Sequence, residues 1–254
     1  MKKKIFIVFI SIVTLYSFVS ALPKDTEDTR PSDFINVKKI IPTIQVNMRY
    51  NTINNFVGEV IDGYQSNICL LTKEASLSLK KVQNQLLPMG LSLKVYDCYR
   101  PQAAVNNFAR WAKDIKNTKM KKQYYPKVDK KELFSSGYIA YKSGHSRGST
   151  MDLTIVPLDS KIPKYNPTKK LVSCTSSQKI REIDNSLDFG TGFDCFSQVS
   201  HPGYKKLSSQ IKANRLLLQK LMVNAGFKAL NEEWWHFTLD KEPYPNTYFN
   251  FPVK

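Results

Sequence analysis

The chain has 254 residues, of which 42% are hydrophobic and 12% aromatic, which is a globular composition rather than a disordered or fibrous one. Its formal net charge is +17, but the lysines and arginines are scattered in short runs, with no basic helix and no basic groove interleaved with aromatic residues. The charge therefore favours a basic solvated surface and argues against a nucleic-acid partner.

The N-terminus has the pattern of a secretory signal peptide. Three lysines precede an apolar run from Ile5 to Val19, and Val19-Ser20-Ala21 has the small residues of a cleavage site. The alternative is an uncleaved membrane anchor, but the run is shorter than the roughly 20 residues that a spanning helix needs. We therefore expect a signal peptide over residues 1–21 that is cleaved near Ala21. The product would be exported to the bacterial periplasm or secreted, without stable membrane insertion.

Two regions are expected after this leader. Residues 22–33 are polar and contain proline, which is typical of a mobile lead-in. The remaining residues, 34–254, show no fixed repeat and are expected to form one domain.

The helices and strands are expected in the following order. A helix capped by Thr72 carries apolar residues on one face and stops at Gly90, and an alternating strand follows to Tyr99. Pro101 opens a second helix that runs to about Lys116. After a long polar surface loop over 158–187 come a third helix over 204–225 and a strand over 232–240. This order, without strict alternation, indicates an α+β fold in which an antiparallel sheet packs with helices.

The cysteine content fits an oxidising compartment. An exported chain with four cysteines is expected to form two disulfides, for which three connectivities are possible. None of the cysteines lies in a CxxC or CxxH arrangement, so thiolate zinc ligation is the weaker alternative. We pair Cys69 with Cys98 and Cys174 with Cys195, because each pair brackets one local unit.

A metal site is indicated by a histidine and an aspartate on either side of a glycine. His145 lies seven positions before Asp152 in the stretch SGHSRGSTMDLTIV. On one flat strand this odd separation would point the two side chains to opposite faces, but a turn at Gly148 would let both face one point. A catalytic zinc site uses three nitrogen or oxygen side chains and keeps one position open. Because the chain has three histidines, the third ligand would be His201 or His236.

A nearby acid favours His236. Glu233 lies three positions before it in EEWWHF, whereas His201, in SHPG, has no spare carboxylate nearby. A zinc hydrolase needs such a carboxylate beside the metal, free to take a proton from the attacking water. Taken singly, each histidine is more often a hydrogen-bonded structural residue, and Arg100 could pair with a surface acid. The joint pattern, with an Asp97-x-x-Arg100 strand end, favours a metal hydrolase.

Three blocks carry a specific resemblance. YDCYRPQAAV, SGHSRGSTMDLT and EEWWHF occur in the same order as the signature blocks of the VanX-type D-alanyl-D-alanine dipeptidases. These are zinc D,D-peptidases that share a fold with the hedgehog signalling domain. VNMRYNTINNFVG and DFGTGFD also resemble segments of this family, and the likeness covers residues 34–250. It implies that residues 34–254 form a zinc D,D-dipeptidase catalytic domain.

The resemblance also implies roles for individual residues. His145, Asp152 and His236 match the zinc ligands, and Glu233 matches the catalytic base. Arg100 matches the arginine that contacts the scissile carbonyl and its tetrahedral successor. The positions that shape or line the small substrate cavity are matched by Asp97, Tyr50, Ser143 and Asp188.

The expected function is hydrolysis of dipeptides of the D-alanyl-D-alanine type, with one Zn²⁺ per chain and a place in cell-wall (peptidoglycan) metabolism. An alternative on the same fold is a D,D-carboxypeptidase or endopeptidase acting on longer wall peptides. A second alternative is a non-catalytic module that binds wall peptides, but the complete set of ligands and base argues against it. The sequence gives no indication of an oligomeric state.

Overall fold

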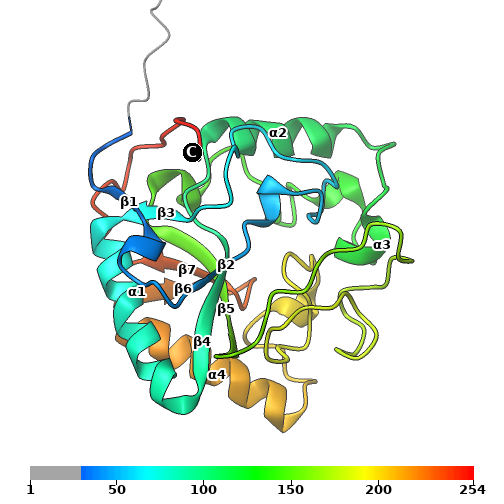
Figure 1. Ribbon diagram of the computed structural model, residues 1–254. Coiled ribbons are helices and arrows are strands. Elements are labelled where there is room, and N and C mark those ends of the chain that lie inside the picture. Colours follow the sequence, from blue (N-terminus) through cyan, green and yellow to red (C-terminus); the bar gives the residue numbers. More distant parts are fainter. Residues whose placement is uncertain (1–29) are drawn as a thin grey trace, which may run out of the picture.

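The computed structural model describes residues 30–254 (Figure 1). The expected signal peptide over 1–21, and the lead-in up to residue 29, lie outside the described residues. Within 30–254, no helix is both long enough and apolar enough to cross a membrane.

Helices and strands are mixed along the described chain, as an α+β fold requires. The strands are β1 (Phe34–Asn36), β2 (Gln45–Val46), β3 (Leu70–Thr72), β4 (Leu91–Asp97), β5 (Thr150–Pro157), β6 (Phe227–Ala229) and β7 (His236–Leu239). The helices are α1 (Lys73–Leu86), α2 (Gln102–Lys113), α3 (Lys121–Tyr124) and α4 (Ser209–Asn224).

A five-stranded sheet in the order β2-β4-β5-β7-β6 forms the centre of the domain. The pairs β4–β5, β5–β7 and β7–β6 are antiparallel, as the sequence suggested. The edge strand β2 is parallel to β4, so the sheet is mixed rather than wholly antiparallel. Strands β1 and β3 form a separate antiparallel pair. Helices α1 and α4 pack against each other beside the sheet, and α2 lies at the far end of the molecule, above β2 and β3 in Figure 1.

The first helix and the strand after it confirm the local sequence signals. The Thr72 side chain accepts a hydrogen bond from the Ala75 N–H, which caps α1, and Leu79 on its inner face is fully buried. Gly90 ends this region in the left-handed conformation, with φ of 68°. Strand β4 is then buried on both faces, because its alternate face carries Lys94 into the interior rather than into solvent.

Several element boundaries differ from the sequence expectation. Strand β4 ends at Asp97 rather than at the expected Tyr99. Helix α2 ends at Lys113, short of the expected Lys116. Helix α4 begins at Ser209, well after the expected residue 204, because the Ser208 side chain accepts the Ile211 N–H and caps the helix there. Of the strand expected over 232–240, only His236–Leu239 forms a strand, β7. The preceding residues EEWW form the loop that leads into it.

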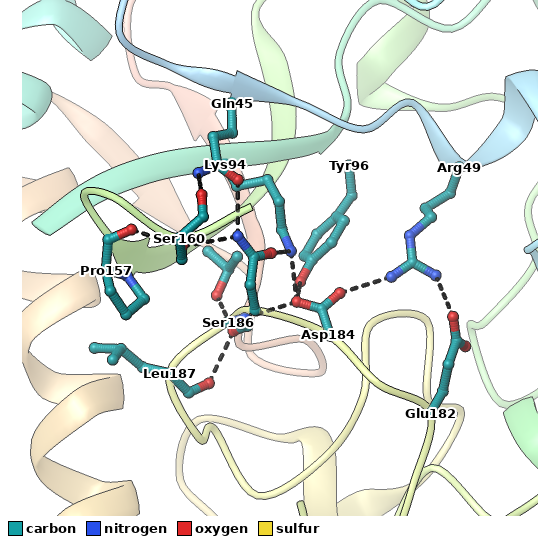
Figure 2. A network of polar contacts seen from close by, with 12 residues as sticks. Gln45, Arg49, Lys94, Tyr96, Pro157, Ser160, Glu182, Asp184, Ser186 and Leu187 are labelled. Atoms are coloured by element: carbon teal, nitrogen blue, oxygen red, sulfur yellow. Dashed lines mark hydrogen bonds and ion pairs between the residues drawn. The ribbon is translucent and has the colours of Figure 1, made fainter. Parts of the chain in front are cut away.

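The long loop over 158–187 contains no helix or strand, as expected, but it is firmly attached to the domain. Its Asp184 carboxylate accepts hydrogen bonds from Arg49, at 2.7 Å, and from Lys94 on β4 (Figure 2). Glu182 from the same loop pairs with Arg49 as well. Two buried cations are thereby neutralised by loop carboxylates, which offsets the cost of burying them.

Both expected disulfides are present. Cys69 is bonded to Cys98, and Cys174 is bonded to Cys195, so the pairing read from the sequence is confirmed. The first bond joins the segment before β3 to the end of β4, and the second joins the long loop to the segment before α4.

Candidate active site

Three side chains from separate elements converge at one end of the sheet. Strands β5 and β7 pair so that Asp152 lies directly opposite His236. His145 comes from a short 3₁₀ turn, Gly144–Arg147, that precedes β5. Gly148 ends this turn with φ of 84°, and a Cβ there would meet the Phe34 ring at 2.2 Å, so the turn requires glycine. The turn therefore brings His145 to the same side of the sheet as Asp152.

The three side chains form a candidate metal centre. His145 Nε2 lies 3.3 Å from His236 Nδ1 and 3.4 Å from Asp152 Oδ1. His236 Nδ1 and Asp152 Oδ1 are 3.1 Å apart. Bonds of about 2.0–2.1 Å in a tetrahedral zinc site place the ligand atoms about 3.3 Å from one another. Asp152 Oδ1 is buried and has no hydrogen-bond donor, as a ligand oxygen should be. The donor set and spacing therefore fit a zinc ion.

Hydrogen bonds outside the cluster fix its orientation. His145 Nδ1 lies 2.8 Å from the Cys98 carbonyl oxygen and must donate to it, which leaves Nε2 as the free ligand atom. Burial opposes ionisation of Asp152, but His145 and His236 outweigh it and hold the pKa of that carboxyl below its usual range. The carboxylate is therefore anionic and ready to bind a cation.

Glu233 lies beside the cluster without being part of it. Its Oε2 atom is 3.6 Å from His236 Nδ1, and its side chain is 16% exposed. Burial is the main cause that raises the pKa of Glu233 to about 7, with the neighbouring Asp152 adding to the effect. A carboxyl group poised near neutral pH is suited to proton transfer.

Arg100 approaches the cluster from the end of β4. Its Nε donates to Asp97 Oδ2 at 2.9 Å, and its Nη2 lies 3.7 Å from Asp152 Oδ2. The guanidinium also lies over the rings of Tyr50, at 5.1 Å, and Phe108, at 5.2 Å. Asp97 is fully buried behind it, so the arginine is held in one orientation with its outer nitrogens beside the metal cluster.

These groups open into one cavity. Its polar lining includes Tyr50, Arg100, Tyr138, Lys142, Ser143, His145, Asp152, Asp194, Glu233 and His236. Apolar side chains close the remaining walls, among them Phe56, Val105, Phe108, Ile139, Phe196 and Leu230. The cavity thus places a candidate metal centre, further carboxyl groups and an arginine around a space with mixed polar and apolar walls.

The remaining residues expected at the site differ in whether they line the cavity. Tyr50 and Ser143 line the cavity, whereas Asp97 supports Arg100 from behind. Asp188, expected to shape or line the cavity, is not among its lining residues: its carboxylate accepts from Arg181 at 2.8 Å and from the Gly190 N–H.

His201 likewise lies apart from the metal cluster. It lines a different hollow of the described surface, and its backbone carbonyl accepts a hydrogen bond from Arg215. The metal cluster found among the described residues contains His236 instead.

Asp194 lines the cavity but was not among the site residues predicted from the sequence. Asp194 is buried, and its Oδ2 atom accepts a hydrogen bond from the Tyr50 hydroxyl at 2.8 Å. Burial, together with the nearby Asp152 and Glu233, raises its pKa well above the usual range. Asp188 and Asp194 both lie in DFGTGFD, and no spacing rule in the sequence distinguishes them.

Comparisons with known proteins show which enzymes this chain is similar to. The chain matches the Peptidase M15 family, described as D-ala-D-ala dipeptidase, over residues 30–163 and 174–254. It is 38% identical to a D-alanyl-D-alanine dipeptidase of Enterococcus faecium over 221 residues, which are 87% of this chain and 98% of the relative. The enzyme of the same name from Enterococcus faecalis is 36% identical, with the same coverage. That of Escherichia coli is 30% identical over 82% of this chain and 85% of the relative.

Proposed function

Because the chain belongs to the D-Ala-D-Ala dipeptidase family Peptidase M15, we propose that it is a zinc-dependent dipeptidase that hydrolyses D-alanyl-D-alanine. The observation that carries this proposal is the single cavity in which His145, Asp152 and His236 face Glu233 and Arg100. The family membership supplies the class of enzyme, and the cavity supplies the residues for the reaction.

The metal would be held by His145 Nε2, Asp152 Oδ1 and His236 Nδ1. Two neutral imidazoles and one carboxylate leave a dication with net positive charge. When bound, zinc supplies Lewis acidity toward the peptide carbonyl and lowers the pKa of water that it binds.

Glu233 is proposed as the general base. Its carboxylate takes a proton from the water that attacks the carbonyl carbon, forming the new C–O bond. It then passes that proton to the amide nitrogen as the C–N bond breaks, so the products are two molecules of alanine. Its position beside His236, with no place among the three ligand atoms, supports this role.

Arg100 is proposed to stabilise the charge that develops on the carbonyl oxygen. Its guanidinium is fixed by Asp97 and by the rings of Tyr50 and Phe108, so little reorganisation is needed during the reaction. Because Arg100 lines the cavity within reach of the residues that would hold the metal, its donors can reach the carbonyl oxygen of a substrate bound there.

Asp194 favours a dipeptide over a longer peptide. Among the carboxylates that line the cavity, Asp152 belongs to the metal cluster and Glu233 is the proposed base, which leaves Asp194 for the substrate. Asp194 is a partner for the free ammonium group of a dipeptide, because that positive charge beside the buried carboxyl group favours its ionised form. A longer wall peptide has an uncharged amide at that position. Ser143 and Lys142 also line the cavity and are available to the terminal carboxylate. This feature favours the dipeptidase over the carboxypeptidase or endopeptidase alternative.

We also propose that the mature protein acts outside the cytoplasm. The leader-like sequence at residues 1–21 and the two disulfides support export into an oxidising compartment. N-terminal sequencing of the protein recovered from the periplasm or medium should then begin just after Ala21. A full-length N-terminus recovered from the cytoplasm would contradict export.

The proposed activity can be tested with three substrates. The zinc-loaded protein is incubated with D-Ala-D-Ala, L-Ala-L-Ala and a wall pentapeptide that ends in D-Ala-D-Ala, and the release of free amine is followed. The proposal predicts cleavage of D-Ala-D-Ala and little cleavage of the other two. Faster cleavage of the pentapeptide would indicate a carboxypeptidase, and no cleavage by protein with full metal content would indicate a binding module.

A further inference from the structure

Asp194 is held in an unusual backbone conformation. Its φ is 54°, and it is the one residue other than glycine with positive φ in the described part of the chain. Residues with a Cβ rarely adopt this region, so something must hold the backbone there. Residues 193 and 194 form a turn outside any helix or strand, so no ladder of backbone hydrogen bonds imposes the conformation.

Contacts on both sides hold this turn. Before Asp194, the Phe193 ring stacks on Tyr96 with centroids 4.5 Å apart and meets Trp235 edge-on at 5.5 Å. After Asp194, Cys195 is bonded to Cys174. The first contact is an apolar packing interaction, whereas the second is covalent and cannot open without reduction.

Cys174 closes a small ring around the turn. Besides the bond to Cys195, its carbonyl oxygen accepts a hydrogen bond from the Gly192 N–H at 2.9 Å. Cys174 therefore contacts the turn on both sides of Asp194, by a hydrogen bond at Gly192 and by the disulfide at Cys195. Cys174 is itself fixed to the domain, because its N–H donates to the carbonyl of Gln123, in α3, at 2.9 Å.

Cys174 directly follows a segment that the family match does not cover. The match stops at residue 163 and resumes at Cys174, so residues 164–173 are outside it. That segment lies mostly on the surface, where Lys169 and Lys170 are exposed. The connection from this segment into the cavity wall is thus made through Cys174 and its disulfide.

We propose that the Cys174–Cys195 disulfide is a positioning device that holds the Asp194 carboxylate toward the substrate amine. The inference rests on the proposed dipeptidase function. Cys174 and Cys195 act through Asp194 and touch no substrate themselves. A small displacement of Asp194 would weaken its contact with the ammonium group without altering the metal ligands.

The test removes the bond while keeping the buried volume apolar. Both cysteines are buried, so the variant Cys174→Ala/Cys195→Ala avoids burying new hydroxyl groups. We expect kcat/KM for D-Ala-D-Ala to fall about 10- to 100-fold, mainly through a higher KM, with metal content unchanged. The preference for D-Ala-D-Ala over N-acetyl-D-Ala-D-Ala, which lacks the ammonium group, should narrow. The surface variant Lys169→Ala/Lys170→Ala serves as the control and should match the wild type.

A double-mutant cycle with Asp194→Ala distinguishes positioning from general stabilisation. If the disulfide acts through Asp194, removing the bond in the Asp194→Ala background should cause no further rise in KM. If the effects of the two changes on KM add, the inference about the disulfide is wrong. It is also wrong if the disulfide variant keeps the KM of an active wild type. Either result would leave the proposed dipeptidase function standing. A wild type that cleaves no D-Ala-D-Ala would overturn the proposed function and the inference with it. If the alanine pair does not fold, Cys174→Ala/Cys195→Val fills more of the buried space and is measured in its place.

Discussion

Asp152 and His236 are directly opposed on the neighbouring strands β5 and β7, and their Oδ1 and Nδ1 atoms lie 3.1 Å apart. Antiparallel pairing thus places two of the three candidate ligands side by side without any loop. The third, His145, reaches them because the turn before β5 ends at Gly148. Two ligands on paired strands and one on a glycine turn make a rigid centre, which a catalytic metal site requires.

The ligand set predicts the effect of replacing each histidine. Metal analysis of the purified protein should find one zinc per chain, and His145→Ala or His236→Ala should lose it, because two remaining ligands bind too weakly. His201→Ala is the matched control and should retain the metal, since His201 lies apart from the cluster. Loss of zinc from His201→Ala would show that the third ligand is misassigned.

Arg100 should contribute to the transition state through the shape of its side chain as well as its charge. Loss of a donor aimed at a developing oxyanion typically costs about 10²–10³ in kcat, so Arg100→Ala should lose activity of that order. Arg100→Lys should recover only part of it, because a flexible ammonium cannot reproduce the planar guanidinium held by Asp97. Steady-state kinetics with metal content measured in parallel would check this. Full activity in Arg100→Lys would reduce the role of Arg100 to a simple charge.

All four cysteines should be oxidised in the mature protein, because the two disulfides join segments at the cavity wall and behind His145. Thiol titration under denaturing, non-reducing conditions should therefore detect no free thiol. Four reactive thiols in protein recovered from its native compartment would refute the pairing and also the proposed export.

The loop network of Figure 2 predicts how stability depends on pH. Burial would raise the pKa of Asp184, but Lys94 and Arg49 outweigh it and hold that pKa below its usual range. A carboxyl whose pKa is lower in the folded state stabilises the fold above its ordinary pKa, near 4, and loses this contribution as the pH falls below that value. The urea midpoint of the metal-free protein should therefore drop steeply below about pH 4.

Two variants test whether the loss of stability at low pH comes from the ion pairs of Asp184. Asp184→Asn should be less stable than the wild type at neutral pH and should show a flatter acid limb, because Lys94 and Arg49 lose their buried partner. Asp62→Asn breaks an exposed ion pair with Arg110 and should change the midpoint little. An acid limb that is identical in Asp184→Asn and the wild type would refute the role of Asp184.

Local signals in the sequence were sufficient for much of the fold. Thr72 as a helix cap, Gly148 as a turn and the two cysteine pairs each depend on nearby residues or on a short bracketed unit, and each was predicted correctly. Distant pairings carry no such signal. The parallel pairing of β2 and the salt bridge that keeps Lys94 inside are set by segments far apart in the chain.

The candidate site shows the same division. The histidine and aspartate before and within β5 carry a pattern of their own, so the convergence of the metal cluster could be anticipated. The choice between Asp188 and Asp194 could not, because it depends on which of them the turn directs toward Tyr50 and which meets Arg181. These contacts join residues far apart in the chain or depend on the local turn, and the spacing of the two aspartates does not reveal them.

The most direct test of the account is turnover of D-Ala-D-Ala by Glu233→Gln, measured together with zinc content. The substitution keeps the shape of the side chain and all three candidate ligands but removes the proton acceptor. The account predicts full zinc occupancy and a loss of about 10²–10⁴ in kcat, with wild-type behaviour in the exposed neighbour variant Glu232→Gln. Near-normal turnover by Glu233→Gln with full zinc would contradict it, and loss of turnover in Glu232→Gln would move the base to that residue.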